Sequence, residues 1–269
     1  MKLSLMSYTF WRQPNFDFAR MCRLGQELGI DGVDVVTLQK QTVDDIRRQL
    51  EAHNLRAICY TFLGGAFAQP DDASRKNGLA EVRQAMQVAR ALGTDKTMLV
   101  TPGLDGVPRE DTRRNYIAGL REAVKIAGDA GIILTVENFP GTSSPFVTAD
   151  DVLQAIAAAP GLKLTFDSGN AFTGEDPVQS FVRCAEHTVH AHFKDWLVVS
   201  EGQGRQMLDG RFYQSALIGE GVLDHAACLR AMRAAGYTGY INIEYEANDY
   251  APDEANRRAA TFLRARGAI

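Results

Sequence analysis

Short runs of β-branched and other apolar residues alternate along the whole chain with longer segments whose apolar residues recur at helical spacing. The short runs are expected to be strands at residues 3–10, 32–36, 55–62, 97–101, 132–138, 162–167, 188–194 and 240–245. The longer segments are expected to be helices at residues 16–28, 43–53, 73–92, 109–130, 148–158, 177–185, 223–235 and 253–266. Strict alternation requires parallel strands joined by crossover helices. Eight such units predict an α/β fold, a single (β/α)8 TIM barrel spanning residues 1–269.

Glycine residues mark the ends of four predicted helices. Gly29, Gly93, Gly131 and Gly236 each follow a helical segment and directly precede a strand, as left-handed helix caps do. The rival fold is a doubly wound open sheet, which usually carries a glycine-rich phosphate loop after its first strand. Residues 8–11, YTFW, contain no glycine, so the barrel is favoured.

The longest predicted connection is residues 196–221, after the seventh strand. It contains several glycines and polar residues, which is typical of a mobile loop. Loops that follow barrel strands form the face on which barrel enzymes carry their active sites. We therefore expect this segment to cover the substrate.

Composition narrows the class of protein. The chain has 269 residues, of which 45% are hydrophobic and 23% charged, and its formal net charge is −4. With a net negative charge, the protein has no overall positive electrostatic potential that would attract nucleic acid. No apolar run is long enough for a membrane span, and the first residues are too polar for a signal peptide. We expect a soluble, cytoplasmic protein with no nucleic-acid or membrane partner, whose four scattered cysteines are buried free thiols.

Four residues of metal-ligand type stand at the ends of strands five to eight. They are Glu137, Asp167, His192 and Glu244. Alternate residues of a strand face opposite ways, so these four face the barrel axis together. Their neighbours are expected to face the helices, and these are Val136, Phe166, Ala191 and Ile243.

Buried carboxylates and imidazoles must be paired or bind a cation. Three carboxylates and one histidine form an oxygen-rich site that suits Mn²⁺ or Mg²⁺, while the imidazole also admits Co²⁺, Fe²⁺ or Zn²⁺. We therefore expect one divalent metal ion. The alternative to a metal site is an ion-pair network inside the barrel that involves Lys163 or Lys194. Taken singly, Glu137 would be interpreted as an ordinary surface residue and His192 as a hydrogen-bonded core residue, so the prediction depends on the whole set.

Five short motifs carry a resemblance to a known family. They are VEN at 136–138, FDSGN at 166–170, HAHFKD at 190–195, GEG at 219–221 and IEYE at 243–246. With them the chain resembles the xylose isomerase-like TIM barrel superfamily, and within it the sugar (phosphate) isomerase/epimerase branch. The resemblance implies metal coordination by Glu137, Asp167, His192 and Glu244, with Glu137 and Glu244 also serving as acid and base. Several sugar epimerases of this branch carry histidine at the position of Asn170, so a substrate contact made by that histidine is not assigned to Asn170.

The expected function is a metal-dependent sugar isomerase or ketose 3-epimerase of carbohydrate metabolism. A metal ion stabilises an enediolate, and carboxylates on either side of a small-molecule sugar move the proton. The alternative keeps this chemistry but ends in elimination, as a dehydratase or lyase on a keto-sugar, keto-inositol or keto-glycoside. An apurinic-site endonuclease of the same superfamily is disfavoured by only five histidines and the acidic balance. A non-catalytic binding protein with this fold would not need two potential bases at the metal ion. The sequence does not decide whether the protein forms a homo-oligomer.

Aromatic and basic residues near the strand ends are expected to contact the substrate. Aromatic rings could cover a sugar ring, and lysine could stabilise a developing oxyanion. The predicted substrate-binding residues are Tyr8, Phe10, His190, Lys194, Trp196 and Arg205, with Trp11, Phe62 and Arg211 as further candidates. Core packing is the alternative for the aromatics, and a salt bridge from Lys194 to Asp195 or Glu220 is the alternative for the lysine. The absence of a phosphate-binding glycine motif favours a non-phosphorylated substrate.

Overall fold

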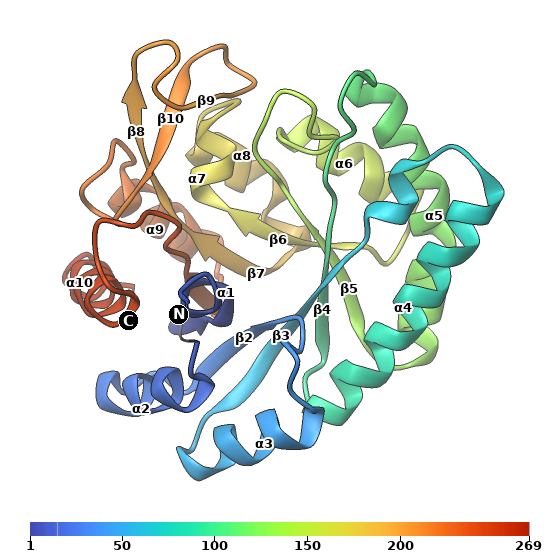
Figure 1. Ribbon diagram of the computed structural model, residues 1–269. Coiled ribbons are helices and arrows are strands. Elements are labelled where there is room, and N and C mark those ends of the chain that lie inside the picture. Colours follow the sequence, from blue (N-terminus) through green and yellow to red (C-terminus); the bar gives the residue numbers. More distant parts are fainter. Residues whose placement is uncertain (15, 269) are drawn as a thin grey trace.

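The computed structural model describes residues 1–14 and 16–268, and its centre is a closed parallel barrel (Figure 1). The strands follow the order β1-β11-β7-β6-β5-β4-β3-β2, and β1 closes the barrel against β2. Their bounds are β1 Lys2–Met6, β2 Gly32–Val36, β3 Arg56–Leu63, β4 Lys96–Val100, β5 Ile133–Glu137, β6 Lys163–Asp167, β7 Thr188–Phe193 and β11 Tyr240–Ile243. The predicted (β/α)8 TIM barrel is therefore confirmed.

Eight helices surround the barrel at the predicted places in the described chain. They are α2 Phe18–Leu28, α3 Val43–Ala52, α4 Asp72–Leu92, α5 Arg109–Asp129, α6 Ala149–Ala158, α8 Pro177–Cys184, α9 His225–Ala234 and α10 Pro252–Ala265. The four predicted glycines after helices all have the left-handed backbone that such caps require, with φ between 63° and 76°. The outward-facing Val136, Phe166, Ala191 and Ile243 are buried in the layer between barrel and helices, as parity predicts.

The first strand is shorter than predicted. β1 ends at Met6, and the short helix α1, Ser7–Trp11, occupies the rest of the predicted segment 3–10. Ser7 Oγ accepts a hydrogen bond of 2.8 Å from Val36 N, and Thr9 Oγ1 both donates to Tyr245 O and accepts from Tyr245 N. These contacts fasten α1 over the carboxyl end of the barrel, a long-range effect that the local β-propensity of the segment does not reveal.

The segment 196–221 is not the irregular loop that its glycines suggested. It forms a three-stranded antiparallel sheet of β8 Asp195–Val199, β9 Arg205–Gln206 and β10 Phe212–Ala216, which projects beyond the barrel (Figure 1). Trp196, Met207, Tyr213 and Leu223 form a small hydrophobic core beneath it. The physical reason is that β8 and β10 pair, and Trp196 and Tyr213 on these strands pack together on one buried face.

A buried carboxylate holds the ends of this sheet in place. Asp195 accepts backbone hydrogen bonds from Trp196, Gly219, Gly221 and Leu223 at 2.9–3.2 Å, and His225 Nε2 lies 3.0 Å from Asp195 Oδ2. Burial opposes the charged form, but the contact with His225 and the backbone donors lower the pKa of Asp195 overall.

Replacing Asp195 by alanine is expected to lower the free energy of unfolding by about 3 kcal/mol, because buried donors lose their shared acceptor. The stabilisation from Asp195 is present above its usual pKa and fades as the pH falls into the acid range, because its folded pKa is the lower one. Thermal unfolding between pH 7 and pH 3 should therefore show the wild type losing its advantage over Asp195→Ala. A constant difference across this range would contradict the assignment, and the exposed Asp150→Ala provides the control.

All four cysteines are buried and free, as predicted. In residues 1–14 and 16–268 the structure contains no helix with both the length and the apolar character needed to cross a membrane.

Candidate metal and active site

A cavity of about 370 Å³ opens at the carboxyl ends of the barrel strands. Its lining combines carboxylates and a histidine with a larger number of apolar side chains. The residues are Met6, Tyr8, Trp11, Val36, Thr37, Gln39, Thr61, Leu63, Met98, Val100, Glu137, Phe139, His192, Glu244 and Glu246. This is the face on which barrel enzymes carry out their chemistry.

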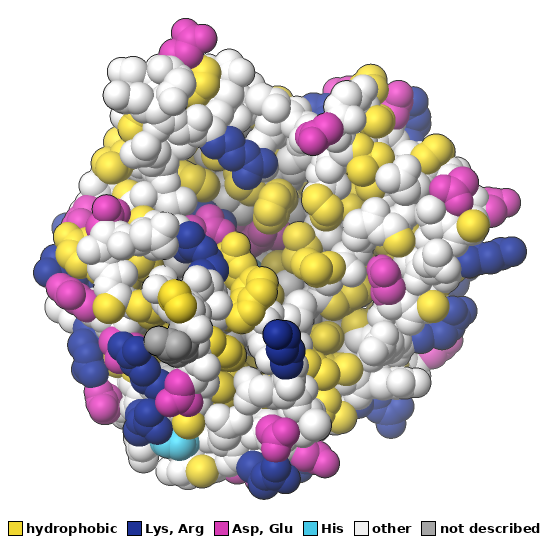
Figure 2. All heavy atoms as spheres, in the orientation of Figure 1, with side chains coloured by type: hydrophobic (Ala, Val, Ile, Leu, Met, Phe, Trp, Pro, Cys, Tyr) yellow, Lys and Arg dark blue, Asp and Glu magenta, His cyan; other side chains and the backbone are white. Residues whose placement is uncertain are grey.

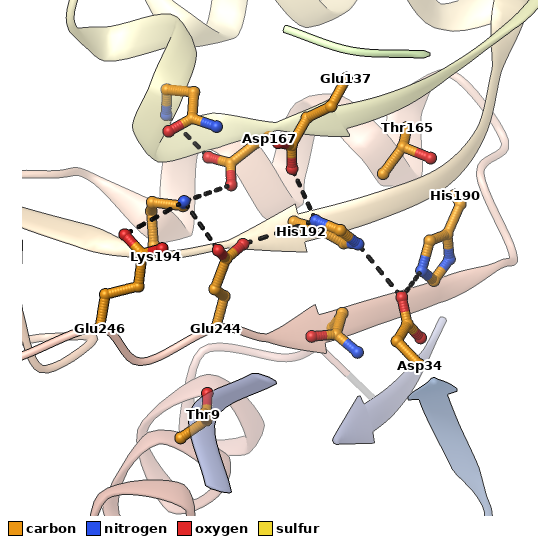
Figure 3. Close-up of polar contacts among 12 residues, drawn as sticks. Thr9, Asp34, Glu137, Thr165, Asp167, His190, His192, Lys194, Glu244 and Glu246 are labelled. Atoms are coloured by element: carbon orange, nitrogen blue, oxygen red, sulfur yellow. Dashed lines mark hydrogen bonds and ion pairs between the residues drawn. The ribbon is translucent and has the colours of Figure 1, made fainter. Parts of the chain in front are cut away.

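The four predicted ligands converge at this cavity. One ligand atom from each of Glu137, Asp167, His192 and Glu244 lies within 4.8 Å of the others. The side chains come from the ends of β5 and β6, from β7 and from the residue after β11, which are successive neighbours in the barrel (Figure 3). Parity along four strands is therefore sufficient to gather them.

His192 lies at the centre of this group. Its Nδ1 is 2.6 Å from Glu137 Oε1 and 3.5 Å from Glu244 Oε2, while its ring is fully buried. Burial opposes the charged ring, but the hydrogen bonds to Asp34 and Glu137 and the nearby carboxylate of Glu244 raise the pKa of His192 well above its usual range. Nδ1 is thus directed at the point where the carboxylates meet.

Lys194 pairs with carboxylates on the other side of the group. Its Nζ donates to Glu244 Oε1 at 2.9 Å and lies 3.6 Å from both Asp167 Oδ2 and Glu246 Oε2 (Figure 3). Burial disfavours the ammonium, but Glu244 and its neighbours raise the pKa of Lys194 and keep it charged. The alternative salt bridges to Asp195 and Glu220 are not formed, so the ion-pair network that involves Lys194 lies within the predicted site.

One lysine does not satisfy every carboxylate oxygen. Asp167 Oδ2 and Glu244 Oε2 are buried without a hydrogen-bond donor among the described residues. Burial, together with the negative charges of Glu137 and Glu244, raises the pKa of Asp167. Unsatisfied carboxylate oxygens beside an imidazole nitrogen are the donor set of a divalent cation, and the spread of the four ligand atoms is small enough for one ion to reach all of them.

Sequence reasoning missed Asp34, a fully buried residue in the middle of β2. Its Oδ2 accepts from His190 Nε2 at 2.6 Å and from His192 Nε2 at 3.1 Å. The bond from Nε2 leaves the other nitrogen of His192, Nδ1, facing the carboxylates, which is the arrangement that orients metal-binding histidines. The signal in the sequence was an inward-facing aspartate in the apolar run GVDVV.

Replacing Asp34 by alanine is expected to weaken divalent-metal binding by about 10- to 100-fold, because the orientation of His192 is no longer fixed. Competition with a chelating dye for Zn²⁺ or Co²⁺ measures this, and Asp34→Asn, which keeps one acceptor oxygen, should recover part of the affinity. Asp151→Ala breaks a buried ion pair away from the site and should leave the affinity unchanged. Equal losses in Asp34→Ala and Asp151→Ala would show a general effect of destabilisation.

The predicted substrate contacts divide into two groups. Tyr8 borders the cavity together with Trp11, and Lys194 lies among the ligands. The other predicted residues lie outside the cavity lining. Phe10 and Phe62 are in the hydrophobic core, and His190 lies beneath His192 and contacts Asp34. Trp196 donates a hydrogen bond from Nε1 to Gly169 O, and the exposed Arg205 donates one to Pro140 O. Arg211 pairs with Asp209 on the β8–β10 side of the molecule. None of the described lining residues comes from 196–221.

Comparisons with known proteins agree with the geometry. A family model described as "Xylose isomerase-like TIM barrel" matches residues 22–266. Inosose dehydratase from Lacticaseibacillus casei is 27% identical over 142 residues, which is 48% of this chain and 45% of that protein, so the match covers less than half of that relative.

Two solved structures show the same fold over nearly the whole chain. D-allulose 3-epimerase from Methylomonas sp. superposes with a TM-score of 0.80 at 17% identity, covering 99% of this chain and 98% of that one. The IolI protein, solved with a bound zinc atom, superposes with a TM-score of 0.81 at 17% identity, with the same coverage.

Proposed function

Since this chain belongs to the xylose isomerase-like TIM barrel family, we propose that it is a divalent-metal-dependent enzyme that isomerises or 3-epimerises a carbonyl sugar by proton transfer. The observation that carries the proposal is the placement of Glu137 and Glu244. Both carboxylates border the cavity, both approach His192 Nδ1, and they come from strands that are separated in the barrel by β6 and β7.

Glu137, Asp167, His192 and Glu244 would hold the metal ion. Three carboxylates favour Mn²⁺ or Mg²⁺, and the imidazole also suits Zn²⁺, the metal bound in the IolI structure. When bound, the cation supplies Lewis-acid stabilisation of the negative charge that develops on the substrate carbonyl oxygen.

Glu137 and Glu244 would move the proton. One carboxylate removes the hydrogen next to the carbonyl, and the other returns a proton at the same or the neighbouring carbon. The ammonium of Lys194, 2.9 Å from Glu244 Oε1, keeps Glu244 ionised and holds its pKa below the usual range despite burial. Burial of both carboxylates at the bottom of the cavity excludes water from the transfer.

A dehydratase or lyase is the second candidate, and Glu246 is the observation that favours it. Glu246 borders the cavity as a third carboxylate near Lys194. Burial and the neighbouring Glu244 raise the pKa of Glu246, so it is suited to protonate a leaving hydroxyl or alkoxide. The name of the inosose dehydratase relative agrees with such an elimination.

Incubation in D₂O with Mn²⁺ and a panel of ketohexoses, ketopentoses and keto-inositols tests the proposal. The expected result is deuterium at the carbon next to the carbonyl of a responsive substrate. A rearranged or epimerised sugar supports the first candidate, and a product with a new double bond supports the second. Conversion without solvent deuterium would count against an exchanging carboxylate.

A further inference from the structure

The cavity has two chemically different halves. His192 and the lining carboxylates come from β7, from the end of β5 and from the residues after β11, whereas β1 to β4 and their connections contribute mainly apolar side chains. The apolar lining residues are Met6, Tyr8, Trp11, Val36, Leu63, Met98, Val100 and Phe139. Figure 2 shows hydrophobic side chains gathered around the central hollow of this face.

Few polar groups in the apolar half can receive sugar hydroxyls. The polar groups in this half are the hydroxyls of Tyr8, Thr37 and Thr61 and the amide of Gln39. The Gln39 amide nitrogen donates to Val36 O and to Thr37 Oγ1. Thr61 Oγ1 is a buried hydroxyl without a partner among the described residues. A free sugar that filled this half would bury several hydroxyls without hydrogen bonds, which is unfavourable.

Large apolar side chains continue from the cavity to its opening. Leu63 is 65% exposed and Trp11 is 44% exposed, although both line the cavity. Tyr8 and Trp11 contact each other with tilted rings whose centroids are 5.5 Å apart, and Thr9 fastens their helix to Tyr245. A continuous, rigidly held apolar surface that leads into a polar catalytic cluster is typical of a ligand site.

The connection after β2 is held in an unusual backbone conformation beside this surface. Thr37, Gln39 and Lys40 have φ values of 50°, 48° and 64°, and none of them is glycine. A left-handed conformation is costly for a β-branched residue such as Thr37, and such costs concentrate at ligand-binding positions. Val36 N donates to Ser7 Oγ at 2.8 Å and Thr37 N to Thr61 O at 2.9 Å, and these bonds hold this part of the wall against α1 and β3.

From these observations we propose that the substrate carries an apolar substituent, such as the aryl or alkyl aglycone of a keto-glycoside, which binds the half of the cavity formed by β1 to β4. This inference rests on the proposed function, since the carbonyl-bearing ring is placed at Glu137 and Glu244. Among the described residues that line the cavity there is no arginine or lysine, which agrees with an uncharged substituent.

A matched pair of glycosides tests the inference. The phenyl and methyl 3-keto-β-D-glucosides differ only in the aglycone, and their dissociation constants for the Mg²⁺-loaded enzyme can be measured by calorimetry. The phenyl compound is expected to bind at least about tenfold more tightly than the methyl compound. Equal affinities, or binding of neither compound, would overturn the inference.

Variants locate the preference in the cavity. Leu63→Asn and the nearly isosteric Met98→Gln are expected to remove most of the phenyl preference while changing the affinity for the methyl glucoside little. Leu197→Asn is the matched control, because Leu197 is similarly exposed (42%) but lies on β8 outside the lining. A preference that survives both cavity variants would overturn the inference.

The inference and the proposed function can fail separately. Deuterium exchange into a free ketose without any phenyl preference would overturn the aglycone site alone. A phenyl preference without deuterium exchange into any carbonyl sugar would leave the aglycone site standing and overturn the proton-transfer function.

Discussion

Glu137→Gln and Glu244→Gln should each reduce turnover at least about 100-fold, the lower range for the loss of an acid or base group. Glutamine keeps the shape of the side chain and one oxygen that can bind a metal, so the main loss is basicity. The two variants need not behave alike, because Glu244 is paired with Lys194 and Glu137 with His192. The variant that still exchanges deuterium without net conversion identifies the carboxylate that acts second.

Single-turnover rates and deuterium incorporation, measured with metal content matched to wild type, distinguish the roles. The exposed Glu201→Gln serves as the control for a neutral glutamine substitution. Wild-type rates in both cavity variants would place the acid and base elsewhere, with Glu246 and Lys194 as the remaining groups at the site.

Asp167→Ala should reduce metal affinity by at least about 100-fold, which exceeds the usual effect of removing a residue that only orients a ligand. Asp167 is fully buried, and its Oδ2 has no hydrogen-bond donor among the described residues. Its removal also leaves Asn170 N without its 2.7 Å acceptor, so stability must be measured in parallel. Elemental analysis after equilibration with Mn²⁺ and desalting provides the readout.

The surface variant Asp150→Ala should retain the wild-type metal content, because Asp150 pairs with Arg183 on the outside of the molecule. Equal metal content in Asp167→Ala and wild type would remove Asp167 from the site. Metal loss together with an unchanged melting temperature would show that Asp167 acts through the ion rather than through packing.

The barrel and the polar half of the site follow from local patterns in the sequence. Period-two alternation fixed which residues of β5, β6 and β7 face inward, and the parallel arrangement then brought Glu137, Asp167 and His192 to one edge. The barrel helices required only apolar spacing and glycine caps. These features depend on a few neighbouring residues, so one sequence is sufficient to predict them.

The remaining features depend on contacts between distant residues. Helix α1 replaces the end of the first predicted strand because Thr9 finds its partner at Tyr245, 236 positions away. Asp34 acquires its role only when β2 and β7 face each other across the barrel. The β8–β10 sheet depends on pairing across a connection that contains glycines, which periodicity reads as a loop. Tyr8 and Trp11 of the apolar wall were predicted, but Val36, Leu63 and Met98 were missed because apolar residues at strand ends look like core.

The four candidate metal ligands lie on or directly after β5, β6, β7 and β11, whereas most of the apolar wall lies on β1 to β4 and their connections, and this separation has a consequence for how the protein can evolve. On the proposed function, substitutions at Val36, Leu63 or Met98 alter the space beside the carboxylates without changing Glu137 or Glu244. The polar strands are instead coupled through His192 and Lys194, so that a change in one disturbs several partners at once. On the same proposal, we expect gene duplicates to diversify in ligand preference through the first four strands while they keep one reaction.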